Sequence, residues 1–132
     1  MRRLISALIA LAMGLNGLAM LLAGRWWYGA VPGVTATGPF NPHFVKDIGA
    51  AYLTVGAAFA WLAAARTEPA RGAALAGAAF LSLHGLIHLA EAVGDPTGLA
   101  DLARDFPAVI LPAIVAVWVA GPRPSSSERR HA

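Results

Sequence analysis

Apolar residues along this chain gather into four long stretches separated by shorter polar segments. The stretches cover residues 4–23, 48–65, 72–93 and 106–120. A helix rises about 1.5 Å per residue, so roughly 20 residues cross the hydrocarbon core of a bilayer. The pattern predicts an all-α fold, an integral membrane four-helix bundle formed by residues 1–122. The fourth stretch is the shortest, and we expect Pro107 and Pro112 to tilt or kink it.

The first stretch also has the basic start and the apolar core of a secretory signal peptide. Its apolar run is long for a signal peptide, and no A-x-A cleavage pattern precedes Arg25. The next residues, Trp26, Trp27 and Tyr28, are typical of an aromatic belt at a membrane surface, as is Trp118 near the other end of the chain. We therefore expect the stretch to be retained as a helix.

Basic residues are distributed unevenly between the two sides of the predicted bundle. Arg2, Arg3, Arg66, Arg71, Arg123, Arg129 and Arg130 fall on one side, and Arg25, Lys46 and Arg104 on the other. Lys and Arg next to membrane helices stay preferentially in the cytoplasm. We expect a multi-pass protein of the bacterial inner membrane with both termini in the cytoplasm. The polar, basic tail at 123–132 is predicted to be disordered.

Composition supports a lipid environment and limits the chemistry. Apolar residues make up 58% of the chain and charged residues 13%, against about 25% charged in soluble domains. The net charge of +3 comes from short basic groups at the ends of apolar stretches, so we expect no nucleic-acid partner. Cysteine is absent, which excludes disulfides, iron–sulfur clusters and thiolate metal sites.

The third stretch contains the sequence HGLIHLAE, in which three ionisable residues share one helical face. His84, His88 and Glu91 are spaced at i, i+4 and i+7. Ionisable groups within membrane helices are energetically unfavourable in hydrocarbon, so they usually face the bundle interior and mark a functional site. This stripe is the first part of a candidate site.

A second polar stripe begins where the sequence reads NPHFVKDIG. Asn41 is a good helix N-cap and a proline follows it, so a helix should begin just before His43. His43 and Asp47 are then one turn apart on one face, which Ala50 and Thr54 continue. The short link at 66–71 makes this helix an antiparallel neighbour of the third stretch.

If the two stripes face each other, they form a cluster of three imidazoles and two carboxylates. The candidate metal ligands are His43, Asp47, His84, His88 and Glu91. These groups suit Cu, Zn or Fe, and haem is less favoured because His43 is shallower than the other two histidines. Three alternatives remain open: carboxylates that orient imidazoles, a proton relay, and a purely structural polar lock between helices.

Other residues support association of the helices. Gly and Ala dominate the second and third stretches, which allows helices to approach closely. Asn16 in the first stretch, with Met13 and Met20 on nearly the same face, is typical of an interhelical hydrogen-bonding residue with flexible packing neighbours. Motifs of nucleotide binding, serine hydrolases and zincins are missing from the sequence, so the balance is against an enzyme.

The length, the four predicted spans and the glycine-rich sequence GLNGLAMLLAG resemble the DoxX-like family of small four-helix bacterial membrane proteins. The resemblance implies a fold and assigns no site residues. Our first functional hypothesis is a small membrane protein with a histidine–carboxylate site in the outer half of the bundle, which binds a transition metal or a small molecule. The second is a non-catalytic accessory or assembly subunit of a larger membrane complex, or of a homo-oligomer. A small transporter is a weaker third option.

Overall fold

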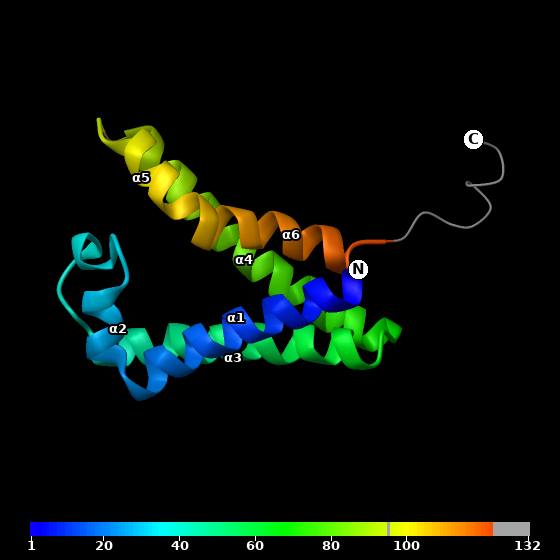
Figure 1. The fold of residues 1–132 in the computed structure, drawn as a ribbon. Helices are drawn as coiled ribbons and strands as arrows, with labels where there is room; N and C mark the ends of the chain where they lie inside the picture. The colour runs from blue at the N-terminus through cyan, green and yellow to red at the C-terminus, as the bar shows by residue number, and fades with distance from the viewer. Residues whose placement is uncertain (95, 123–132) are drawn as a thin grey trace.

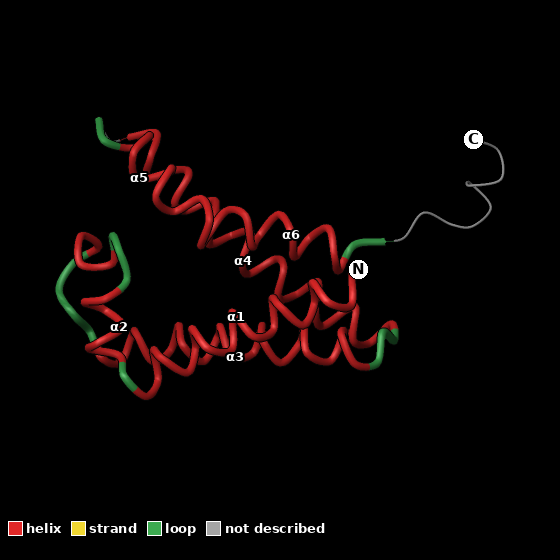
Figure 2. The backbone as a smooth tube through the Cα atoms, in the orientation of Figure 1, coloured by secondary structure: helices red, strands yellow, loops and turns green. Residues whose placement is uncertain are grey.

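The computed structural model describes residues 1–94 and 96–122, which are mostly helical (Figures 1 and 2). In this part of the chain, four helical segments are long and apolar enough to cross a membrane: Arg2–Leu22, Pro42–Ala64, Glu68–Gly94 and Gly98–Ala120. The prediction of four long apolar helices is confirmed, although each begins earlier in the chain than its apolar stretch. The tail at 123–132 lies outside the described residues.

The elements follow one another with short connections. They are α1 (Arg2–Leu22), α2 (Gly24–Ala30), the 3₁₀ turn η1 (Val34–Thr37), α3 (Pro42–Ala64), α4 (Glu68–Gly94), α5 (Gly98–Asp105), the π-helical turn η2 (Phe106–Ile110) and α6 (Leu111–Ala120). The predicted start of α3 is confirmed. The Asn41 side chain accepts hydrogen bonds from the backbone N–H groups of His43 and Phe44, both at 3.1 Å.

The long helices form two pairs, α1 with α3 and α4 with α6 (Figure 1). The pairs lie close together at the end that holds the N-terminus and the link between α3 and α4, and they diverge toward the end that holds α2 and α5. The core lies between the helices around Phe59, Met20 and Leu62. Among the described residues, no side chain of α4 beyond Leu81 and none of α5 belongs to this core.

Glycines let the backbones of α1 and α3 touch. A Cβ atom on Gly17 would lie 2.6 Å from the Gly49 carbonyl oxygen, and one on Gly49 would lie 2.8 Å from the Met20 Cβ. Farther along, a Cβ on Gly56 would lie 2.9 Å from the Gly14 backbone nitrogen. Real Cβ atoms do not approach so closely, so these positions require glycine. Close backbone contacts of this kind are typical of helices that associate in lipid, where no hydrophobic driving force acts between them.

Two arginines of α1 bind carbonyl groups at the ends of other helices. Arg3 donates from Nε to the Ala63 carbonyl and from Nη2 to the Ala64 carbonyl, both at 2.8 Å. Arg2 donates from Nη1 to the Gly121 carbonyl at 3.3 Å. The last carbonyls of a helix lack intrahelical partners and carry partial negative charge. The N-terminus is thus tied to the ends of α3 and α6.

The segment before Phe106, which lies outside the four predicted apolar stretches, is helical. It forms α5, and the chain continues through η2 into α6 without leaving the helical conformation. Pro107 has no N–H to donate to the preceding turn, and the wider π turn at Phe106–Ile110 accommodates it. Its polar residues, among them Asp101, Arg104 and Asp105, explain why α5 lies outside the fourth apolar stretch.

The aromatic run after α1 divides into different roles. Trp26 is exposed. Trp27 donates from its indole N–H to the Asn16 carboxamide oxygen at 2.8 Å, and the Tyr28 hydroxyl donates to the Gly38 carbonyl. Asn16 is therefore a hydrogen-bonding residue as predicted, and it ties α2 back onto α1. Of the run, Trp26 presents its side chain outward, as a membrane anchor would.

Candidate functional site

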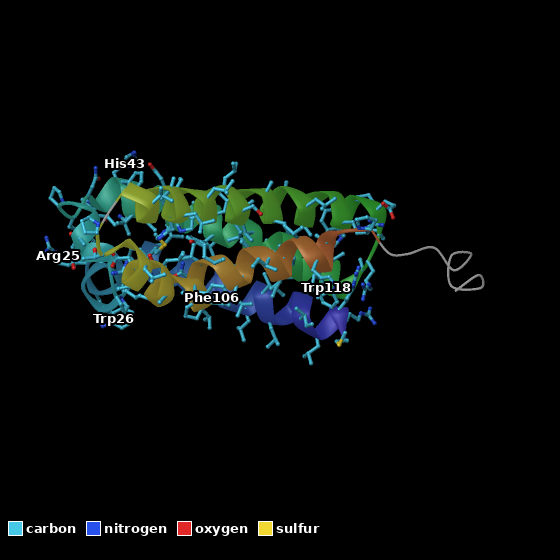
Figure 3. All side chains as sticks on the ribbon, turned by 90° about the horizontal axis from the view of Figure 1, so that it is seen from above. Arg25, Trp26, His43, Phe106 and Trp118 are labelled. Atoms are coloured by element: carbon cyan, nitrogen blue, oxygen red, sulfur yellow. The ribbon has the colours of Figure 1, made fainter. Side chains whose placement is uncertain are left out.

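The predicted stripe on α3 faces away from the other helices. His43, Asp47, Ala50 and Thr54 are all exposed, and the side chains of His43 and Asp47 are 88% and 60% accessible. They pair with each other, His43 Nε2 to Asp47 Oδ2 at 3.4 Å. Figure 3 shows His43 at the edge of the molecule, at the same end as Arg25 and Trp26.

The opposite face of α3 packs into the bundle. Its buried residues are Val45, Gly49, Tyr52, Val55, Gly56, Phe59 and Leu62. The stripe of His43 and Asp47 is therefore on the exposed face of α3, so the condition for a joint cluster, that the two stripes face each other, is not fulfilled in this structure. The spacing argument placed His43 and Asp47 on one face correctly, but that face is not the one that contacts α4.

The three residues of the stripe on α4 differ in how far they are buried. His84 and His88 are half-buried, and Glu91 is exposed. The two imidazoles meet edge to face, with ring centroids 4.8 Å apart. His84 is stacked parallel to Phe80 at 6.3 Å and stands edge-on to Tyr52 of α3 at 6.1 Å. Aromatic neighbours on both sides thus fix the position of the His84 ring.

His88 is paired with a carboxylate that the sequence analysis did not include. His88 Nδ1 lies 2.8 Å from Asp105 Oδ2, and the two side chains are only 24% and 12% accessible. The pairing depends on α5 lying close along α4. Gly98 at the start of α5 permits this approach, because a Cβ there would overlap the Ala92 backbone.

Arg104 connects Asp105 to the surrounding segments. It donates from Nε to Asp105 Oδ1 at 2.7 Å, from Nη2 to Asp105 Oδ2 at 3.1 Å, and from Nη1 to Asp101 Oδ1 at 2.6 Å. Its guanidinium also packs against Gly33 before η1, where a Cβ would lie 2.6 Å from Arg104 Cζ. Gly33 has a φ of +85°, which also favours glycine.

Together these groups form one continuous polar chain. It runs from Asp101 through Arg104 and Asp105 to His88, and then by ring contacts to His84 and Tyr52. We call the set of His84, His88 and Asp105 the α4–α5 site. Asp105 fixes the orientation of the His88 ring through Nδ1, which leaves Nε2 as the nitrogen that can bind another group.

Metal binding by all five predicted residues stays a prediction. Within residues 1–94 and 96–122, no three or more His, Cys, Asp or Glu side chains are grouped so that they could hold a metal ion. The α4–α5 site itself offers two imidazoles one helical turn apart. A metal ion there would need further ligands from water or from a bound molecule.

Two neighbours of the site that were not predicted, Phe80 and Tyr52, could have been found from the sequence. Phe80, His84 and His88 follow one another at four-residue spacing, and Tyr52 shares the face that Gly49 and Gly56 mark as buried. Asp105 had no such signal, because it is 17 residues from His88 and on another helix.

Comparison of the chain with protein-family models, with curated protein sequences and with solved structures found no match. The resemblance to DoxX-like proteins therefore stays a prediction, and function has to be argued from the site.

Proposed function

We propose that this chain is a multi-pass protein of the bacterial inner membrane that binds a transition metal ion at the α4–α5 site. His84 and His88 supply two nitrogen ligands, and water or a small molecule completes the coordination. The observation that carries the proposal is the 2.8 Å contact between His88 Nδ1 and Asp105 Oδ2. A carboxylate that holds the second ring nitrogen is the usual support of a metal-binding histidine.

The spacing of the histidines supports the same proposal. Two histidines at i and i+4 on one helix are the arrangement that zinc-binding helices use. Imidazole also suits Cu and Fe, so the choice among Cu, Zn and Fe depends on the completing ligands. Metal sites that do chemistry keep such open positions, whereas closed sites with four protein ligands are structural.

The membrane placement rests on the four long apolar helices and on the distribution of charge. Arg2, Arg3, Arg66 and Arg71 all lie at the converging end of the helix pairs. Basic residues favour the cytoplasmic side, so the converging end is cytoplasmic in our proposal. The α4–α5 site then lies in the outer half of the protein, within reach of periplasmic metal ions.

The test is the metal content and optical spectrum of the full chain, purified in detergent without a polyhistidine tag. We compare wild type with the His84→Ala/His88→Ala double variant and with His43→Ala. We expect about one metal ion per chain in wild type and in His43→Ala, and none in the double variant. His43 is a matched control because it is a histidine of the same end that faces away from the site.

The Asp105→Asn variant tests whether Asp105 orients His88 or binds the metal itself. Asp105→Asn keeps the size of the side chain but removes its charge, so we expect metal affinity to fall about 10- to 100-fold without being abolished. Metal-free wild type after growth with Cu, Zn and Fe would contradict the proposal. Loss of the metal in His43→Ala as well would instead favour the five-residue cluster that the sequence predicted.

A second candidate function is an accessory subunit of a larger membrane complex or a homo-oligomer. The exposed stripe on α3 favours it, because Asp47 and Thr54 face away from the other helices along a segment that is apolar enough to cross a membrane. Polar groups in such a place are normally covered by another helix. A defined assembly in mild detergent that Asp47→Leu dissociates would support this function, and a monomeric wild type would argue against it.

A further inference from the structure

A small hollow lies at the converging end of the bundle, where all four long helices meet. It has a volume of about 100 Å³, well above the roughly 10–15 Å³ that one water needs. It lies between the start of α1, the link from α3 to α4, and the end of α6. The α4–α5 site is at the opposite end of α4, so the two features are separate.

The walls of the hollow are basic and part of its lining is apolar. Among the described residues that line it, Arg2, Arg66 and Arg71 carry guanidinium groups and Glu68 carries a carboxylate, while Leu62 and Val119 contribute apolar surface. Glu68 is largely solvent-exposed and pairs with Arg71 Nη1 at 2.9 Å. Guanidinium N–H groups match the oxygens of a phosphate group.

Arg66 has an unusual backbone conformation. Its φ is +55°, in the left-handed region, and it follows Ala65, the C-cap of α3, at a position that glycine often occupies. Glycine adopts this conformation without steric strain, whereas arginine does so unfavourably. The strained residue is also one of the three cations around the hollow, and backbone strain of this kind gathers at functional sites.

A tryptophan indicates the depth of the hollow. The Arg2 guanidinium lies 4.8 Å from the centre of the Trp118 ring. Tryptophan concentrates at the level of lipid headgroups, and basic pockets between helices on the cytoplasmic side bind anionic headgroups. The apolar part of the lining suits the glycerol portion of a lipid better than a fully hydrated free anion.

We propose that this hollow binds the phosphate of an anionic phospholipid through Arg2, Arg66 and Arg71. The proposal goes beyond the metal site and shares with it only the membrane placement. It predicts one lipid molecule that stays with the protein through purification, held by charge and by the shape of the pocket.

The experiment is native mass spectrometry of the full chain in detergent, titrated separately with phosphatidylglycerol, phosphatidylcholine and inorganic phosphate. We expect phosphatidylglycerol to bind more tightly than phosphatidylcholine. Removing one pocket arginine should weaken phosphatidylglycerol about fivefold and phosphatidylcholine, whose choline cation offsets its phosphate, by less. Inorganic phosphate that displaces phosphatidylglycerol at equal concentration would overturn the lipid assignment in favour of a free anion.

Arg66→Gly is the decisive variant. It removes a cation and relieves the left-handed strain at the same residue, so the protein should melt at the same temperature or higher while it loses lipid affinity. Arg3→Gln is the matched control, since Arg3 lies at the same end but donates to the carbonyls of Ala63 and Ala64. Equal weakening by Arg3→Gln would show a diffuse surface attraction and overturn the pocket. Unchanged affinity in Arg66→Gly would overturn it too.

Discussion

The contact between α1 and α3 and the contact between α4 and α5 hold helices together by opposite means. The first is made of glycine backbones that touch at Gly17, Gly49 and Gly56, with scarcely any space for a side chain. The second is made of charged and polar side chains, centred on the pairing of His88 with Asp105. Close packing fixes a distance between helices, whereas hydrogen-bonded side chains fix an orientation of a ring.

The difference explains why the proposed site lies at the α4–α5 contact. A glycine contact cannot accept a new atom, because every Cβ added there meets backbone. The α4–α5 contact lies at the diverging end of the helix pairs, where side chains are half-buried and a ligand can reach them. The glycine contact holds the fold together, and the polar contact is the one at which we propose metal binding.

The largest effect is expected from a substitution that breaks the glycine contact between α1 and α3. Gly17→Ala places a Cβ 2.6 Å from the Gly49 carbonyl oxygen, so α1 and α3 must separate, and we expect a loss of about 1–3 kcal/mol in the free energy of unfolding. Gly14→Ala is the matched control on the same helix, because its Cβ meets no atom within 4 Å. Reversible unfolding in mixed micelles measures both. Equal stability of the two variants would contradict the close contact.

The next largest effect is expected from a substitution that breaks the polar contact between α4 and α5. Asp105→Ala removes the acceptor of both His88 and Arg104. Arg104 is exposed and solvent screens its charge, so we expect a loss of only about 1 kcal/mol. The same unfolding measurement checks it. Asp101→Ala serves as the control, since Asp101 binds Arg104 but has no contact with His88 recorded in the described residues, and it should leave the His88 ring in place.

A smaller effect is expected from removing the hydrogen bond between α2 and α1, beside the glycine contact. Trp27→Phe removes the indole N–H that donates to Asn16 at 2.8 Å. The ring still packs, so the loss is that of one neutral hydrogen bond, about 0.5–1 kcal/mol. Unfolding followed by circular dichroism reports it. A loss as large as that of Gly17→Ala would mean that the hydrogen bond, and not the glycine contact, positions α1.

The smallest effect sharpens the contrast between the two polar stripes. His43→Ala removes an exposed side chain whose recorded partner, Asp47, is itself exposed. We expect stability within about 0.5 kcal/mol of wild type. Thermal unfolding of His43→Ala beside His84→Ala makes the comparison. A strongly destabilised His43→Ala protein would mean that another chain covers the α3 stripe.

Much of the fold could be predicted from the sequence, because length and hydropathy suffice for long apolar helices. The start of α3 could be predicted too, since Asn41 and Pro42 act locally. Helix α5 was missed because it is only eight residues long and rich in charge, and the partners of its charged residues lie partly on α4 and before η1.

The candidate site was predicted only in part, and for a related reason. Spacing shows which residues share a helical face, but it does not show which face is buried. On α3 both faces carry small residues, and the decisive difference is that Gly49 and Gly56 lie opposite the stripe of His43 and Asp47. Weighing glycine spacing above charge would have placed His43 outside and Tyr52 inside.

The π turn at Phe106–Ile110 determines the direction in which Asp105 points. A π turn contains one residue more than an α turn, so it is the form that a single-residue insertion takes within a helix. If residues 106–110 formed an ordinary α-helix with no residue removed, α5 would be rotated by about 100° relative to α6, the rotation of one residue. Asp105 would then point away from His88 while the contacts of α6 stayed in register. The wider turn thus takes up one extra residue and keeps the carboxylate facing His88.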